Sequence, residues 1–245
     1  MTQESWLFAW IGAADHQAAE ADDRERPGPI ASALLAHVRF DRVVLLTNYG
    51  FERSRPYCDW LEALTSYVIT RDSRLARNGA DLLGAFMHPA AIPALTAAIG
   101  RTDLSAEARL AAVRALGMIG HPNGKAGLTT ALADSDASVR LEALTDWPKL
   151  RKVTDAAPVV ARVSDGDARV RAAAAGVIGT LRFAGGRAAL EAALASDADA
   201  NVRRNAAWAL GQIGDPASRT ALVAAQGDAS ALVRATAKAA TYALR

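Results

Sequence analysis

Apolar residues recur along most of this chain with the spacing of an amphipathic helix. Within residues 199–216 they fall at Val202, Ala206, Ala209, Leu210 and Ile213. These offsets of 0, 4, 7, 8 and 11 form one stripe on an α-helix. Asp199 stands where an N-cap belongs, and Gly211 and the sequence Gly214-Asp215-Pro216 are expected to end the helix.

The same pattern returns about every thirty-one residues. Arginines are separated by 32, 31, 31, 32 and 31 residues, at positions Arg77, Arg109, Arg140, Arg171, Arg203 and Arg234. Four of them follow a valine, namely Val139, Val170, Val202 and Val233. Such a period is typical of stacked helical repeats, each of which buries its apolar stripe against its neighbours. We expect the arginines to be structural, bonding caps or carbonyls of an adjacent unit.

One unit departs from the pattern. Around Arg140 the glycine ending is replaced by Trp147-Pro148. Trp147 lies eight residues after Val139, the place that Leu210 holds in its own unit, so we expect it in the core. Proline cannot continue a helix, so the sequence predicts an irregular joint there.

These units resemble the HEAT repeat, in the short form first noted in phycobilisome lyases. The shared pattern is Asp-x-x-Val-Arg-x-x-Ala-Ala-x-Ala-Leu-Gly-x-Ile-Gly-Asp-Pro. The resemblance covers residues 69–245 and implies a mainly α fold, an α-solenoid of about five to six helical hairpins, with the Val-Arg helices on its concave face. Offsets 2, 3 and 6 from the valine point away from the core stripe. We expect another protein to bind there, at Leu141, Glu142, Thr145, Arg204, Asn205 and Trp208. Trp208 has an alternative interpretation, in which it packs against a neighbouring helix.

The first 68 residues have a different pattern. Residues 6–11 and 43–46 are unbroken apolar runs closed by turn residues, which suit strands buried on both faces of a parallel sheet. Helices are expected at 30–38 and 57–64, and a polar loop at 16–26. The order predicts a small β-α-β-α, Rossmann-like parallel-sheet module over residues 1–68, followed by the repeat domain over 69–245.

Three phrases in this module, at residues 10–15, 28–34 and 40–49, are similar to the start of the sensory domain of the activator of the bacterial RNA-repair operon. That domain is related to the CARF family of CRISPR-associated Rossmann-like folds. The resemblance implies a cyclic oligonucleotide or an RNA end as ligand, bound at strand ends and usually across a homodimer. The candidate ligand-binding residues are Gly12, Ala13, Asp15, Gly28, Pro29, Thr47, Asn48 and Tyr49. The family domain is about twice as long, so the module here docks on the repeats, dimerises, or has lost its pocket.

Charge is distributed unevenly. Residues 1–68 hold six Lys/Arg and ten Asp/Glu, a net of 6 − 10 = −4, and the remainder holds 22 − 16 = +6. This indicates either two differently charged domains or a basic array that meets an acidic partner. An alternative function is therefore nucleic-acid binding through Arg151, Lys152, Arg162, Arg169, Arg182 and Arg187.

No catalytic constellation is visible, and the four histidines lack metal-ligand spacing. We therefore expect no metal, no cofactor and no enzymatic activity; a bilin-lyase activity would rest on the repeat resemblance alone. The single cysteine, the absence of a secretory signal and the lack of an apolar run of roughly 18 residues predict a cytoplasmic bacterial protein away from membranes. The expected function is a protein-interaction scaffold with a nucleotide-sensor-like module, in bacterial RNA-repair or defence signalling.

Overall fold

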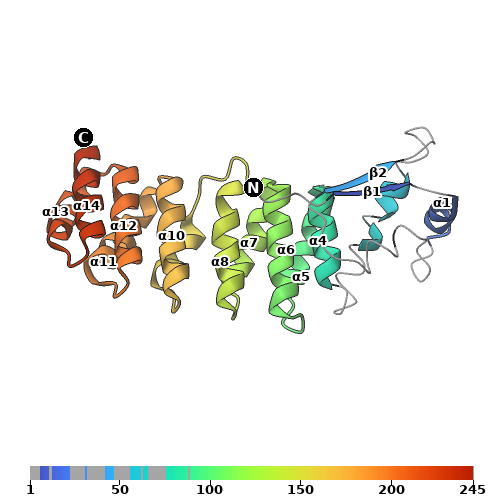
Figure 1. Cartoon of the computed structure of the whole chain (residues 1–245), viewed down its shortest axis with the longest axis horizontal. Helices are drawn as coiled ribbons and strands as arrows, with labels where there is room; N and C mark the ends of the chain where they lie inside the picture. The colour runs from blue at the N-terminus through green and yellow to red at the C-terminus, as the bar shows by residue number, and fades with distance from the viewer. Residues whose placement is uncertain are drawn as a thin grey trace. The chain divides into compact units, whose positions relative to one another are not determined.

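A computed structural model describes residues 6–10, 13–22, 31, 42–46, 56–61, 63–65, 76–87 and 89–244. Most of these residues are helical, and the chain divides into two compact units, Met1–Thr130 and Ala131–Arg245. Stacked helical hairpins make up most of the described residues of each unit, so the repeat fold predicted from the thirty-one-residue period is confirmed (Figure 1).

The first unit combines a short strand pair with two helical repeats. Its elements are β1 (Trp6–Trp10), α1 (Ala13–Glu20), β2 (Arg42–Leu46), helical residues at 56–61 and 63–65, α4 (Ala76–Phe86), α5 (Ile92–Ile99), α6 (Ala106–Ile119) and the start of α7 (Lys125–Ala131). Helix α6 packs against both α4 and α5. Short 3-10 turns precede α5 and α7, at Pro89–Ala91 and Pro122–Gly124.

The front of this unit is not the Rossmann-like module that the sequence predicts. β1 and β2 pair in parallel over five residues each, but these two strands form the whole sheet among the described residues. Two such strands bury too little apolar surface to make a sheet domain, and β2 lies against the repeat helix α4. The predicted β-α-β-α parallel-sheet module is therefore wrong, and the described chain is a mainly helical repeat protein.

Two further expectations for this segment have different outcomes. Residues 16–26 were expected to form a polar loop, whereas α1 covers Ala13–Glu20, so that expectation is wrong for residues 16–20; residues 21–22 form a turn. The helix expected at 57–64 is present, and Tyr57, Leu61 and Leu64 are fully buried within it. The helix expected at 30–38 lies outside the described residues except for Ala31.

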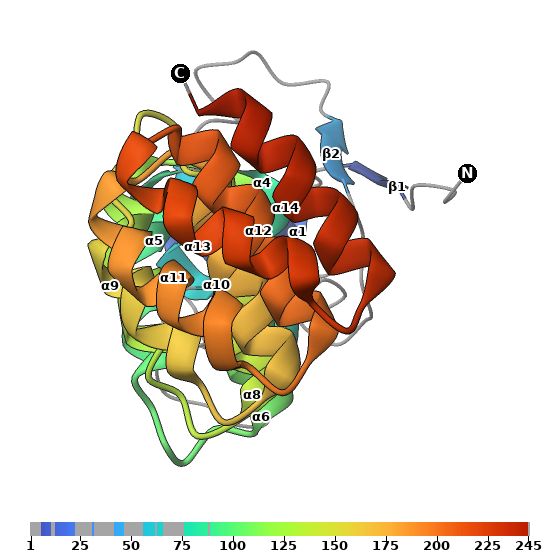
Figure 2. The same ribbon diagram turned by 90° about the vertical axis from the view of Figure 1, so that its left-hand side faces the viewer.

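The second unit consists of helices and short turns throughout its described length. Its α-helices are α8 (Ala137–Asp146), α9 (Ala157–Val160), α10 (Ala168–Thr180), α11 (Arg187–Ser196), α12 (Ala200–Ile213), α13 (Arg219–Ala224) and α14 (Ala231–Ala243). Helices α8, α10, α12 and α14 carry the Val-Arg pairs and lie side by side as the first-helix layer (Figure 1). Helices α9, α11 and α13 form the second-helix layer on the other side of these helices (Figure 2).

Local chemistry fixes where the Val-Arg helices begin and what they bury. Asp136, Asp167 and Asp199 are the N-caps of α8, α10 and α12, and each carboxylate accepts a hydrogen bond from a backbone N–H two residues further on, at 2.7–2.8 Å. These bonds satisfy N–H groups that a helix start leaves without partners. The four valines of the repeat, Val139, Val170, Val202 and Val233, are fully buried, as the apolar stripe predicts.

The irregular joint predicted after Arg140 is present. Helix α8 ends at Asp146, and Trp147-Pro148-Lys149 forms a 3-10 turn. The Trp147 ring is fully buried, and its Nε1 donates a hydrogen bond to the Asp155 carbonyl at 3.3 Å. The prediction that Trp147 belongs to the core is confirmed.

Glycines let the first-helix layer pack closely. A methyl group at Gly179 of α10 would lie 2.8 Å from Cα of Ala209 on α12, and one at Gly211 would lie 2.8 Å from Cβ of Ala240 on α14. Gly211 was expected to end its helix, but α12 continues to Ile213 and is closed by Gly214, whose φ is +76°. Gly211 therefore serves interhelical packing, and Gly214 supplies the left-handed conformation at the end of the helix.

Candidate partner-binding surface

Three of the repeated arginines make the same ion pair with the loop of the following repeat. Nε and Nη2 of each arginine donate to both carboxylate oxygens of an aspartate 25 or 26 residues further along, at 2.7–3.0 Å. Nη1 of the same arginine donates to two carbonyls of its own preceding loop. We call these pairs the Arg–Asp rungs: Arg140–Asp165, Arg171–Asp197 and Arg203–Asp228. The expectation that the arginines are structural is confirmed for these rungs, which leaves other residues to meet a partner.

The rungs hold their carboxylates in the ionised form. Burial by itself would raise the pKa of Asp165 and Asp197, but hydrogen bonds from Arg140 and Arg171 outweigh it and lower both pKa values. For Asp228 the hydrogen bond from Arg203 is the largest influence, and it lowers the pKa. A half-buried bidentate pair of this kind is a strong contact because neither partner keeps full access to water.

These pKa shifts predict acid sensitivity. The folded-state pKa of each rung aspartate lies below its ordinary value, so near pH 4 the unfolded chain binds more protons than the folded chain. The stabilisation is present above the unfolded pKa of about 3.9 and is lost as the pH falls through the folded pKa. We expect the urea midpoint to fall steadily from about pH 5 to about pH 2.5, and to fall less in Asp197→Asn. A midpoint independent of pH over this range would contradict the prediction.

The exposed side of the first-helix layer centres on Trp208. Its side chain is 39% exposed, although part of the ring lies against α10, where a methyl group at Gly179 would come within 2.5 Å of Cζ3. The alternative interpretation, packing against a neighbouring helix, holds for one edge of the ring, which lies on Gly179; the rest of the ring faces solvent, and partner binding there stays a prediction. The ring is therefore held in place and still accessible.

The two other predicted residues of α12 lie in one hydrogen-bonded network. Asn205 Nδ2 donates to the Ala172 carbonyl of α10 at 2.9 Å, which ties the two helices together. Nε and Nη2 of Arg204 donate to Asn205 Oδ1 at 3.2 and 2.9 Å. Arg204 and Asn205 are both partly exposed. The network fixes a guanidinium on the same helix face as Trp208.

On helix α10, the positions 2, 3 and 6 residues after the buried valine carry small side chains, which leave room on the surface. The residues that correspond to Arg204, Asn205 and Trp208 are Ala172, Ala173 and Gly176, all partly exposed. A methyl group at Gly176 would meet nothing within 4 Å. The residues predicted on α8 are also accessible: Leu141 and Glu142 are partly exposed and Thr145 is exposed. Sequence reasoning missed Gly176, although its offset of six from Val170 could have identified it.

Comparison with known proteins identifies the repeats. A family model described as HEAT repeats matches residues 54–146 and 156–241, which is more than half of the chain. The chain belongs to the HEAT-repeat family. The match begins before residue 69, and the boundary predicted between residues 68 and 69 stays a prediction. No curated protein matches the sequence.

Solved structures agree on the fold. An engineered protein is 17% identical with a TM-score of 0.53, over 94% of this chain and 67% of its own. Cex1p is 16% identical with a TM-score of 0.53, over 77% of this chain and 43% of its own. Human deoxyhypusine hydroxylase in complex with glycerol is 20% identical over 94% of this chain and 96% of its own, with a TM-score of 0.43. The first two similarities support the helical-repeat fold alone.

Three of the six basic residues that the sequence proposed for nucleic-acid binding form ion pairs within the HEAT repeats. Arg169 pairs with Asp167 at 2.7 Å, Arg162 with Asp165 at 3.4 Å, and Arg187 with Glu191 at 3.0 Å and with Asp215 at 3.1 Å. The remaining three, Arg151, Lys152 and Arg182, are exposed. Ion pairs of this kind reduce the positive charge available to a phosphate backbone.

The ligand residues predicted near the front of the chain are only partly described. Asp15 lies in the first turn of α1, is 3% exposed, and accepts a hydrogen bond from the Tyr57 hydroxyl at 3.3 Å. Burial, followed by the neighbouring Asp15, raises the pKa of Tyr57, so the hydroxyl stays protonated and able to donate. Ala13 begins α1. Gly12, Gly28, Pro29, Thr47, Asn48 and Tyr49 lie outside the described residues. Asp15 therefore lies in a helix and not in the loop that was predicted after the first strand, and its carboxylate contacts Tyr57.

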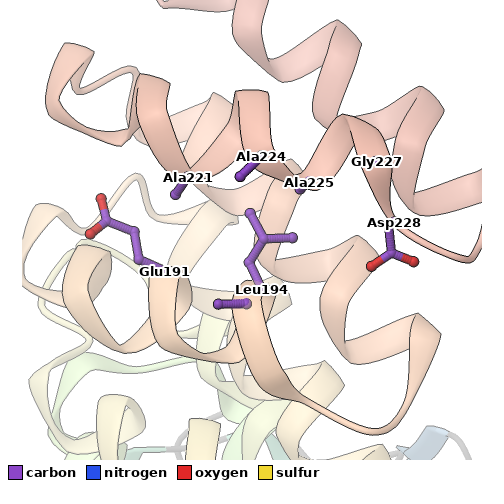
Figure 3. A pocket seen from close by; sticks show the side chains of 8 residues that line it. Glu191, Leu194, Ala221, Ala224, Ala225, Gly227 and Asp228 are labelled. Carbon is purple, nitrogen blue, oxygen red and sulfur yellow. The ribbon is translucent and has the colours of Figure 1, made fainter.

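A small hollow of about 290 Å³ lies between α11 and α13 in the second-helix layer (Figure 3). Its walls are Leu194, Gly227 and four alanines, with Glu191 and Asp228 at opposite ends. Both carboxylates already have partners, because Glu191 accepts from Ser218 Oγ at 2.8 Å and Asp228 belongs to a rung. Both carboxylates that line the hollow are therefore already engaged in contacts within the protein, and the rest of its lining is apolar.

Metal-binding and membrane-spanning features are also absent from the described residues. No group of three or more His, Cys, Asp or Glu in the part of the chain that the structure covers could hold a metal ion. Among the same residues, no helix has both the length and the apolar character needed to span a bilayer. His121 caps a turn, because its Nδ1 accepts a hydrogen bond from the Asn123 N–H at 3.2 Å.

Proposed function

We propose that this HEAT-repeat protein is a non-enzymatic interaction scaffold that binds another protein on the first-helix layer of its second unit. The observation that carries the proposal is the pairing of a held but accessible Trp208 with open space at Gly176 on the next helix. An indole with one anchored edge loses little conformational freedom on binding, and Trp and Arg dominate the energetics of protein interfaces. Arg204 supplies the neighbouring cation.

The charge around Trp208 favours an acidic or neutral partner. Helices α10, α12 and α14 contain no Asp or Glu, whereas α8, further along the layer, carries Glu142 and Asp146. Their arginines at the rung positions Arg171 and Arg203 are occupied by aspartates, which leaves Arg204 as the cation beside Trp208. The HEAT-repeat family supports a role in protein interaction at this coarse level.

A blocking substitution tests the surface without removing its contacts. Gly176→Arg places a long side chain where a methyl group meets nothing, so the fold should be retained and the partner displaced. Ala192→Arg makes a matched change at an exposed position of α11, in the second-helix layer. We expect proteins captured from host-cell extract by the wild type and by Ala192→Arg to be depleted roughly ten-fold with Gly176→Arg and with Trp208→Ala.

The same variants provide a control for misfolding and the result that would contradict the proposal. The thermal unfolding temperature of Gly176→Arg should be at least that of the wild type, because arginine favours the helix more than glycine does, and this separates blocking from misfolding. Recovery of the same proteins by Gly176→Arg and by the wild type would place the partner elsewhere and reject this surface.

Nucleic-acid binding receives less support from the structure, because three of its six candidate cations are in ion pairs. Nucleotide sensing, and with it a role in bacterial RNA repair or defence, rests on the resemblance of the front segment. Asp15, the one candidate there whose side chain is described, is buried against Tyr57. Nucleic-acid binding and nucleotide sensing stay predictions, as does bilin-lyase activity.

A further inference from the structure

The last helix of the second unit carries an arginine whose guanidinium is only half used. Nη1 of Arg234 donates to the carbonyls of Asp228 at 2.8 Å and Ala229 at 3.0 Å, as Nη1 of each rung arginine does in its own loop. In the rungs, Nε and Nη2 then reach an aspartate of the next repeat. Arg234 has no such carboxylate among the described residues, and it is exposed. Its fork is therefore oriented by the protein and open to a carboxylate from outside.

Other exposed residues of α14 extend this position into a surface. Lys238 and Tyr242 follow Arg234 at intervals of four, so the three side chains share one side of the helix. Tyr242 is 77% exposed and Leu232 is 52% exposed. We call Leu232, Arg234, Lys238 and Tyr242 the end face; α14 and α13 are in front when the molecule is viewed from this end (Figure 2). Residues 229–245 contain no Asp or Glu, so the face is cationic and partly apolar.

The end face differs from the surfaces that meet inside the stack. Nine residues after the buried valine, α10 has Gly179 and α12 has Gly211, and at both positions the next helix approaches closely. At the same offset from Val233, α14 has Tyr242. A tyrosine there would not allow an approach as close as those at Gly179 and Gly211. Like the faces that α10 and α12 present to the next helix, the end face carries an arginine that can bind a carboxylate. Unlike those faces, it has a bulky tyrosine where they have a glycine.

We propose that the end face binds an acidic helix of another polypeptide. One carboxylate of that helix takes the place that an aspartate holds in each rung, a second lies one turn away against Lys238, and an apolar side covers Tyr242 and Leu232. A second copy of this chain fits less well, because a two-fold contact would bring like charges together at Arg234 and Lys238. A nucleic acid fits less well too, because two cations flanked by apolar side chains neutralise few phosphates.

Fluorescence anisotropy with the full chain tests this proposal. The probe is a labelled helical peptide of about twenty residues with glutamates at i and i+4 and leucines on the adjoining side, and its matched analogue has glutamine at those positions. Arg234→Gln/Lys238→Gln is compared with Lys152→Gln/Arg182→Gln, which removes two exposed cations elsewhere in the unit. We expect the first variant to lose roughly ten-fold or more in affinity and the second to lose less than about three-fold. Arg234→Glu/Lys238→Glu should instead prefer a lysine version of the peptide.

Several results would overturn the proposal. They are equal binding of the glutamine peptide, equal losses in both glutamine variants, or failure of the charge-reversed variant to switch preference. Tighter binding of a uridine oligonucleotide that depends on Arg234 and Lys238 would assign the face to nucleic acid. Self-association of the wild type that Arg234→Gln/Lys238→Gln abolishes would assign it to a second copy. Gly176→Arg is expected to leave peptide binding unchanged, so this test is separate from that of the proposed function.

Discussion

Arg171→Ala is expected to lower the free energy of unfolding by about 2–4 kcal/mol. The Arg171 side chain donates to Asp197 at 2.7 and 2.9 Å and to the carbonyls of Asp165 and Gly166 at 3.0 and 3.3 Å. Its removal leaves the buried carboxylate of Asp197 without its counter-charge and two carbonyls without their donor. The contact that is removed joins two repeats, so its loss should destabilise the whole unit and not one loop alone.

Urea unfolding followed by circular dichroism measures this effect. Arg169→Ala is the matched control, because Arg169 is on the same helix and also pairs with an aspartate, Asp167, but is 65% exposed. An exposed pair is screened by solvent and contributes little to stability, so this variant should remain close to the wild type. If the two alanine variants unfold at the same urea concentration, the rungs do not hold the repeats together as described.

Gly179→Ala and Gly176→Ala are expected to change stability in opposite directions. The two glycines lie one turn apart on α10, so the intrinsic gain in helix propensity is the same, roughly 0.5–1 kcal/mol. At Gly179 the added methyl group would meet the backbone of Ala209 at 2.8 Å and the Trp208 ring at 2.5 Å, and the resulting overpacking should cost about 1–3 kcal/mol. At Gly176 it meets nothing, so the propensity gain remains.

The same unfolding measurement compares these two variants. We expect the urea midpoint to rise for Gly176→Ala and to fall for Gly179→Ala. A rise in both would mean that α10 and α12 can separate at little cost, and that Trp208 is not held by Gly179.

Features set by neighbouring residues could be predicted from the sequence. The N-cap aspartates, the buried valines and the core position of Trp147 each depend on the helix in which they occur, and each is confirmed. The rung partners were missed because an arginine pairs with an aspartate 25 or 26 residues away, a contact that stacking creates. An aspartate recurs six residues before the repeated arginine in successive units, and this was the available signal.

The role of Gly211 and the fold of the front of the chain could not be predicted from neighbouring residues. A glycine near a helix end has two physical uses, a left-handed stop or a close contact, and local sequence did not distinguish them at Gly211. Short apolar runs likewise predicted a parallel-sheet module, but a strand pair becomes a sheet domain only with further strands beside it. In the described residues β2 packs against α4 instead, so the run belongs to a helical repeat protein.

Photo-crosslinking most directly tests the claim that a partner binds the first-helix layer. A benzoylphenylalanine replaces Gly176 in one variant and Ala192, on the second-helix layer, in another. We expect the first variant to crosslink a protein that Trp208→Ala fails to recover, and the second to crosslink none. Crosslinks formed from position 192 and not from position 176 would contradict the account.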